Sequence, residues 1–179
     1  MHVKMFAAGL AAVVGCGTPI VLNDLHQNAV EQAAQQADAR STEQLQLARE
    51  LPPNPPDVAG AFVDLLAEGG TVAAQEGCML FDASAASEFA ADHHRPTCIA
   101  AMTELQAQVS DPSTYTDDLS VPPTAWTAMG GTATLNGCAL SWSGAFSDAP
   151  DTPPGPLPGQ WTLTQLDGEG WQITQYWPC

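Results

Sequence analysis

Residues 161–177 read WTLTQLDGEGWQITQYW, and this stretch decides the fold. Apolar residues alternate with Thr and Gln on both sides of the tetrapeptide DGEG at 167–170. Alternation of this kind is typical of a strand with one buried face, and a glycine-containing turn between two such runs predicts a β-hairpin. We therefore expect two antiparallel strands, with Ile173 and Trp177 facing the core and Tyr176 on the opposite face.

Two more strands are expected before this hairpin. Residues 138–142 alternate between apolar and smaller or polar side chains, which predicts one strand. The other is expected within residues 124–135, interrupted or bulged at Gly130-Gly131. Residues 148–159 are rich in proline and predict a long loop between the second and third strands.

The sequence before residue 110 has the periodicity of helices. Four helices are expected: one from Val58 to Gly69, one from Thr71 to Leu80, a short one that Asp82 or Ser84 caps, and one that Pro96 opens. Asp111, Pro112 and Asp117-Asp118 instead predict a solvated loop. Helices followed by antiparallel strands predict an α+β domain over residues 57–179, with the helices on one face of a curved sheet.

The N-terminus has the features of an export signal. Lys4 precedes an uncharged apolar run over residues 5–15, and Cys16 follows a Val-Val-Gly sequence. This ending resembles the bacterial lipobox, which implies cleavage after residue 15 and lipid attachment to Cys16. The alternative is an uncleaved transmembrane helix over residues 5–22, although Gly17 and Pro19 disfavour it. Both interpretations place the rest of the chain on the extracytoplasmic face of the cell membrane.

Residues 16–56 are expected to separate the anchor from the domain. The segment 23–49 is rich in Gln, Ala and Glu, a composition that favours a helical stalk but gives a poor heptad series for a coiled coil. Residues 52–56, PPNPP, cannot continue a helix and predict a stiff, extended joint.

Four cysteines remain once Cys16 is set apart. An even number of cysteines in an exported chain predicts disulfides. Three pairings are possible, and we favour Cys78 with Cys98 and Cys138 with Cys179, because each pair then lies within one structural half. No two of them have the close spacing of a structural zinc site, so no metal is expected there.

The charge of the chain excludes several classes of partner. Twenty acidic residues against four basic ones give a formal net charge of −16. Nucleic-acid binding needs a basic surface, so this class is excluded, and docking on anionic lipid headgroups is equally unfavourable.

The cysteines and the closing strand also suggest a family. The runs at 77–81, 85–89 and 97–102 place two cysteines around a short helix, and a Gly170-Trp171 strand ends near Cys179. This arrangement resembles a pattern of actinobacterial exported proteins in the NTF2-like (SnoaL-like) superfamily. The resemblance implies a cone-shaped α+β fold, which hosts enzymes, ligand binders and assembly modules alike.

We find no catalytic set in the sequence. Asp92-His93-His94 predicts a solvated connection between helices and not a metal site, because neighbouring side chains point apart. Enzymes of the NTF2-like fold pair an Asp or His base with a Tyr or acid partner inside the cone, and no such pair is evident here. Asp82 is expected to be a helix cap. Five tryptophans could line an apolar pocket, although a filled core is the favoured interpretation; they are Trp126, Trp142, Trp161, Trp171 and Trp177.

Three functions follow as hypotheses, in this order. The first is a membrane-anchored, non-catalytic accessory protein without a cofactor that binds another envelope component or a membrane-protein complex. The second is a binder or carrier of an apolar small molecule in the cone. The third is an NTF2-like lyase or isomerase.

Overall fold

The computed structural model describes residues 32, 36, 39, 46–142 and 153–179. The expected signal peptide (1–15), Cys16, most of the stalk and the first part of the 148–159 loop lie outside these residues. Contacts divide the chain into residues 1–41 and residues 42–179, and the second unit contains the helices and strands of the domain. None of the helices in the described part of the chain is long and apolar enough to cross a bilayer.

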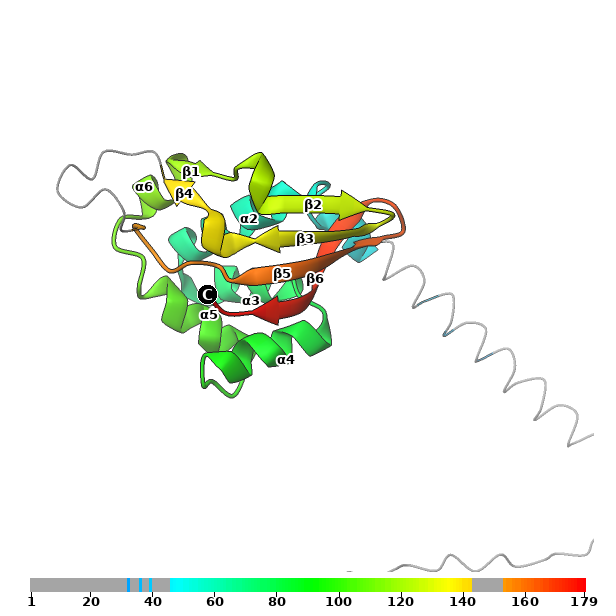
Figure 1. The fold of residues 1–179 in the computed structure, drawn as a ribbon. Coiled ribbons are helices and arrows are strands. Elements are labelled where there is room, and N and C mark those ends of the chain that lie inside the picture. The colour runs from blue at the N-terminus through cyan, green and yellow to red at the C-terminus, as the bar shows by residue number, and fades with distance from the viewer. Residues whose placement is uncertain (1–31, 33–35, 37–38, 40–45, 143–152) are drawn as a thin grey trace, which may run out of the picture. The chain divides into compact units, whose positions relative to one another are not determined.

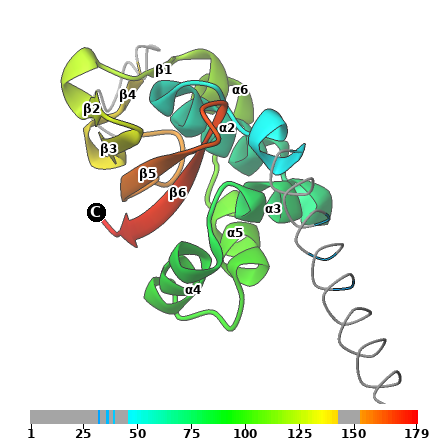
Figure 2. The same ribbon diagram turned by 90° about the vertical axis from the view of Figure 1, so that its right-hand side faces the viewer.

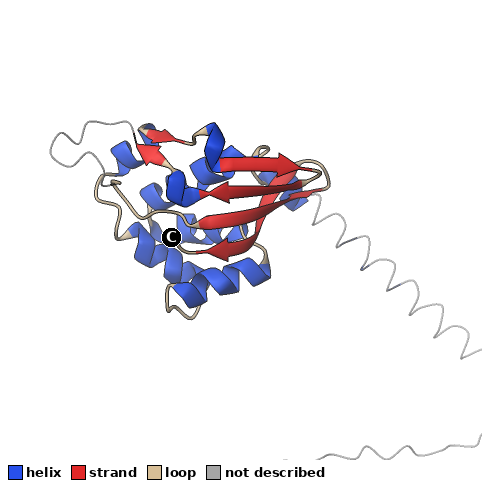
Figure 3. Ribbon diagram, viewed as in Figure 1, coloured by secondary structure: helices blue, strands red, loops and turns tan. Residues whose placement is uncertain are grey.

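The domain is built from helices followed by strands, as the sequence predicts (Figures 1 and 3). The helices are α2 (Pro55–Glu68), α3 (Gly70–Met79), α4 (Ala83–Asp92), α5 (Cys98–Gln106) and α6 (Pro112–Asp117). The strands are β1 (Leu119–Ser120), β2 (Trp126–Met129), β3 (Thr132–Asn136), β4 (Ser141–Trp142), β5 (Gln160–Leu166) and β6 (Gly170–Trp177). Two 3-10 turns, η1 (Pro123–Ala125) and η2 (Gly137–Ala139), flank β2 and β3.

The main sheet has four antiparallel strands in the order β2-β3-β5-β6, and β1 pairs with β4 in a separate two-stranded sheet. The expected hairpin is present, with Leu166 opposite Gly170 at its closed end. The helices lie on one face of the four-stranded sheet (Figure 2). The α+β class expected from the sequence is therefore confirmed.

Aromatic side chains fill the space between the helices and the sheet. Phe62 of α2 makes an edge contact with Trp161 of β5, with 5.3 Å between ring centroids, and it also contacts Phe81 and Phe89. Seven sheet residues point inward and are buried: Ala133, Leu135, Trp161, Leu163, Trp171, Ile173 and Tyr176. This apolar burial is the main source of the domain's stability.

A β-bulge in β6 reverses the expected facing of its last residues. Leu163 pairs with Ile173 but Thr162 pairs with Gln175, so Thr174 is the extra residue. Alternation therefore shifts by one position, and Tyr176 is buried whereas Trp177 is 48% exposed. The prediction that Trp177 faces the core and Tyr176 faces away was wrong, because a bulge changes which side chains share a face.

Three other local predictions need correction. Residues 124–135 form two strands and not one, because Gly130 and Gly131 both adopt positive φ and make a tight hairpin turn. Residues 138–142 form a 3-10 turn and a two-residue strand in place of one continuous strand. The segment after Asp111 is helix α6, which the Asp111 carboxylate caps by accepting from the Thr114 N–H.

The end of the expected stalk belongs to the packed domain. Ala48 and Leu51 are buried, and Arg49 forms an ion pair of 3.3 Å with Glu169 in the β5–β6 turn. The proline-rich segment 52–56 is not an extended joint: Pro55 and Pro56 begin α2, where a missing N–H has no cost. The Pro52 carbonyl accepts a hydrogen bond from the Trp171 N–H, which fixes the segment against β6.

Candidate functional site

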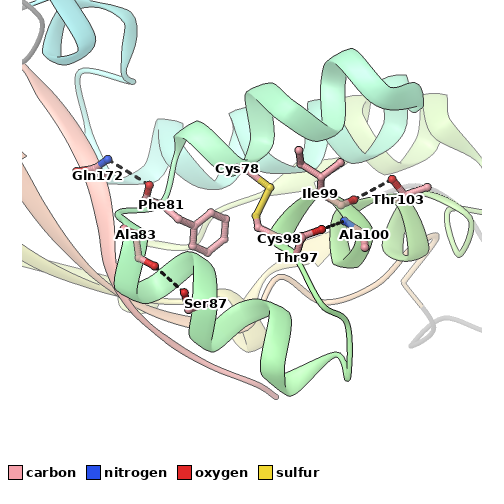
Figure 4. The surroundings of a disulfide bond; sticks show 10 residues. All are labelled: Cys78, Phe81, Ala83, Ser87, Thr97, Cys98, Ile99, Ala100, Thr103 and Gln172. Atoms are coloured by element: carbon pink, nitrogen blue, oxygen red, sulfur yellow. Dashed lines mark hydrogen bonds between the residues drawn. A yellow bond between two sulfur atoms is a disulfide. The ribbon is translucent and has the colours of Figure 1, made fainter. Parts of the chain in front are cut away.

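Two disulfides cross-link the domain in the pairing expected from the sequence. Cys78 near the end of α3 bonds to Cys98, the first residue of α5 (Figure 4). Thr97 caps α5 by accepting a hydrogen bond from the Ala100 N–H beside this disulfide. Asp82 likewise caps α4 by accepting from Ala85, which confirms its predicted role. The first disulfide therefore stabilises the helical half of the domain.

The second disulfide lies at one end of the main sheet. Cys138 follows β3 by two residues, and Cys179 follows β6 by two residues. The bond thus ties together the ends of two strands that β5 separates. Asn136 and Trp177, the last residues of these strands, are held near each other across β5.

A groove of about 280 Å³ crosses the sheet at this end. We call it the outer groove; its lining residues are Thr124, Ala125, Trp126, Thr127, Thr134, Leu135, Asn136, Gln160, Trp161, Thr162 and Trp177. Asn136, Gln160 and Trp177 lie opposite one another on adjacent strands and form one rung of the ladder. Trp126 lies at the other edge of the sheet, so the groove runs across all four strands.

The outer groove carries no charged side chain. None of its lining residues is Asp, Glu, Lys, Arg or His, and neither is any residue of β2, β3, β5 or β6. The protein as a whole has a net charge of −16. The acidic residues are therefore placed on the helices, turns and loops, and one face of the sheet is left neutral.

The floor of the outer groove offers hydrogen-bonding groups. The Thr127 and Thr134 hydroxyls lie 2.9 Å apart, and the Thr162 hydroxyl donates to Gln175. The Asn136 side-chain oxygen accepts from the Cys138 N–H, which leaves its amide N–H groups available. Gln160 is exposed in the same rung. The floor therefore has both donors and acceptors for a neutral polar ligand.

The five tryptophans do not share one pocket. Trp126, Trp161 and Trp177 line the outer groove, although Trp161 is a buried core residue. Trp171 is buried in the core beneath the N-terminal segment. Trp142 stacks on Tyr115, with 5.4 Å between ring centroids, and donates its indole N–H to the Tyr115 carbonyl. Trp126 pairs with the buried Leu135 and packs against the core, so core packing accounts for most of these residues, as favoured, and Trp177 is the exposed one.

The structure brings His93 and Tyr176 together, a pair that the sequence reasoning missed. The His93 Nε2 atom lies 3.2 Å from the Tyr176 hydroxyl, and both rings pack edge-on against Phe89. Burial lowers the pKa of His93, and burial with the nearby Asp92 charge raises the pKa of Tyr176. Both groups are therefore neutral near pH 7, and His93 is part of the packing and not of a solvated loop.

A second cleft, of about 460 Å³, lies between α4 and the start of α5. It is lined by Ala86, Ser87, Ala90, Ala91, Arg95, Pro96, Thr97 and Cys98. The Arg95 guanidinium is already paired with Glu104, so it has no free charge to direct a ligand. Neither His93 nor Tyr176 lines this cleft or the outer groove. Within the described residues, no three His, Cys, Asp or Glu side chains gather into a potential metal site.

Comparisons with known proteins identify no relative. No protein-family model matches the chain, and neither a curated protein nor a solved structure matches it. The outer groove is therefore interpreted from its own residues.

Proposed function

We propose that the protein is a non-catalytic accessory module, anchored by lipid on Cys16 outside a bacterial cell membrane. In this proposal it binds another envelope component or a membrane-protein complex through the outer groove. The observation that carries the proposal is a neutral groove with an exposed tryptophan, Trp177, on a protein of net charge −16. An uncharged, concave surface with an exposed aromatic ring and convergent polar groups has the composition of a binding site.

The lipid anchor is supported by the sequence around Cys16. The motif Val13-Val14-Gly15-Cys16 and the odd cysteine count both set Cys16 apart from the disulfide-bonded four. Two or more acyl chains anchor a protein stably, whereas one chain alone is marginal. Replacing Cys16 with Ala is expected to release the protein from the membrane fraction; retention of that variant by the membrane would favour the spanning helix.

An NTF2-like cone is our proposal for residues 57–179. It is supported by the order of elements, with helices followed by an antiparallel sheet that the helices cover on one face. The alternative function, a carrier of an apolar molecule in the cone, is less favoured because Phe62 packs against both Phe89 and Trp161 there.

A lyase or isomerase is the least favoured function. The His93–Tyr176 pair is the base and donor that such chemistry needs, but each group already satisfies the other. Both rings are packed against Phe89, and neither lines a described cleft. A catalytic base must reach a proton of its substrate, so this pair is better explained as a contact between α4 and β6.

Photo-crosslinking in cells tests the proposal directly. A photoreactive amino acid is placed at Thr134 in the outer groove or, as a matched control, at Ser87 on α4, in the full-length chain with its own N-terminus. We expect a discrete adduct from position 134 and little from position 87. An adduct from position 87 with none from position 134 would refute the groove as the binding surface.

A further inference from the structure

The chemistry of the outer groove points to a ligand class. We propose that the outer groove binds a short, neutral saccharide chain of the cell envelope, an inference that rests on the proposed binding function. Three observations on the same surface carry it: the absence of charge, the amide and hydroxyl floor, and the exposed Trp177 at one edge.

Charge excludes the main alternatives. A polyanion would meet no cation in the outer groove, and the net charge of −16 would repel it at long range. A cationic peptide would find no carboxylate among the lining residues and would instead be attracted to the acidic helices and turns. A neutral ligand has no charge to leave unpaired when it is desolvated in the groove.

The floor distinguishes a saccharide from a lipid. Asn136, Gln160, Thr134 and Thr162 present amides and hydroxyls side by side on neighbouring strands. The two hydroxyls are already bonded to Thr127 and Gln175, but an apolar chain would bury the amide N–H groups of Asn136 and Gln160 without partners, at a cost of about 1–3 kcal/mol for each unsatisfied group. Sugar hydroxyls both donate and accept, so they satisfy amide and hydroxyl side chains in either role.

The Trp177 edge of the groove suits the apolar face of a sugar ring. Trp177 is 48% exposed although it is a large aromatic residue, and the β6 bulge is what turns it outward. Trp126, at the opposite edge, pairs with the buried Leu135, so it shares the inward face and packs against the core. The C–H groups on one face of a pyranose pack against an aromatic ring, so a sugar ring at the Trp177 edge can stack on this indole while its neighbours in the chain lie over the amide floor.

The disulfide at the end of the sheet holds this arrangement. Cys179 lies two residues beyond Trp177, and Cys138 lies two residues beyond Asn136. The covalent bond therefore limits the motion of the Trp177 edge relative to the amide floor. Such pre-organisation lowers the entropy that a ligand loses on binding.

Saturation-transfer NMR tests the inference on the full-length protein, extracted in a detergent that has no sugar headgroup. The probes are maltotriose, cellotriose and mannotriose, with trigalacturonic acid as the charged control and lauric acid as the apolar one. We expect saturable transfer to at least one neutral trisaccharide and none to trigalacturonic acid. Transfer to none of the three neutral sugars, or saturable binding of lauric acid in the groove, would overturn the inference.

Variants locate the binding and separate this inference from the proposed function. Trp177→Ala and Gln160→Ala are each expected to weaken trisaccharide binding by about tenfold or more. Gln165→Ala, on the same strand but outside the groove, is the matched control and is expected to change nothing. Equal effects of Gln160→Ala and Gln165→Ala would refute the location. If position 134 still forms a cellular adduct but no sugar binds, the ligand class is wrong and the binding function stands; if both fail, both are wrong.

Discussion

The Cys138–Cys179 disulfide gives a prediction whose magnitude follows from its position in the chain. It spans a sequence separation of 41 residues, and the Cys78–Cys98 bond spans 20. The chain-entropy model assigns about 4 kcal/mol to closing the longer loop in the unfolded state and about 3 kcal/mol to the shorter one. Replacing both members of a pair with Ala should therefore lower the free energy of unfolding by these amounts, with the larger loss for Cys138 and Cys179.

Urea unfolding of the full-length protein in detergent, followed by tryptophan fluorescence, measures both losses. The Cys138→Ala/Cys179→Ala variant should have the lower midpoint of the two. Each double variant keeps the other disulfide, so each serves as the control for the other. A loss below about 1 kcal/mol for the longer loop would refute the reasoning, as would non-reducing peptide mapping that links Cys78 to Cys138 or Cys179.

Three further predictions concern the core and the N-terminal segment. Burial lowers the pKa of His93, so as pH falls the unfolded chain takes up this proton at a higher pH than the folded chain does. Stability should therefore fall as pH drops below about 6.5 and stay level above it. Thermal melts of His93→Gln should show a flatter dependence on pH. Tyr176→Phe removes the hydroxyl that bonds to His93 and should cost about 1 kcal/mol in urea unfolding, and no loss would contradict the pairing. Gly170→Ala should destabilise the domain, because the added Cβ would lie 2.5 Å from the Leu51 Cβ. Gly60→Ala, in the open interior of α2, should instead stabilise the domain by about 0.5–1 kcal/mol. Equal effects of the two variants would refute the packing of the N-terminal segment.

Local patterns in the sequence predict much of this fold. The turn at 167–170, the helical spacing from Val58 onward and the cap at Asp82 depend on residues close together in the chain. The two disulfide pairs could be favoured because each one joins elements of the same half of the domain. These features need little knowledge of tertiary contacts, which is why they could be predicted.

The outer groove could not be predicted, because it depends on a bulge that tertiary contacts stabilise. Ile173 uses its N–H and carbonyl toward Leu80 and Asp82, on the side of β6 away from β5. Thr174 is then left as the extra residue opposite β5, and the facing of Trp177 reverses. A strict alternation of faces had placed Trp177 in the core. The same reversal buries Tyr176 beside His93, so one missed bulge concealed both the groove and the pair.

The sequence shows that the strands lack charged side chains, but it does not show that they combine into one neutral surface. Residues 126–136 and 160–177 contain charged side chains only in the turn between β5 and β6. Only the strand order shows that these segments form one continuous neutral face. Composition taken over the whole chain excludes nucleic acid, but it cannot show where on the surface a neutral partner would bind.

Hydroxyl-radical footprinting of the protein in its native envelope, compared with the purified protein, tests the binding surface most directly. Trp177 in the outer groove and Met79 on α3 are both 48% exposed, so they form a matched pair of oxidisable side chains. We predict that the envelope protects Trp177 from oxidation and leaves Met79 as reactive as in the purified protein. Protection of Met79 with Trp177 unchanged would contradict the assignment of the outer groove as the binding surface.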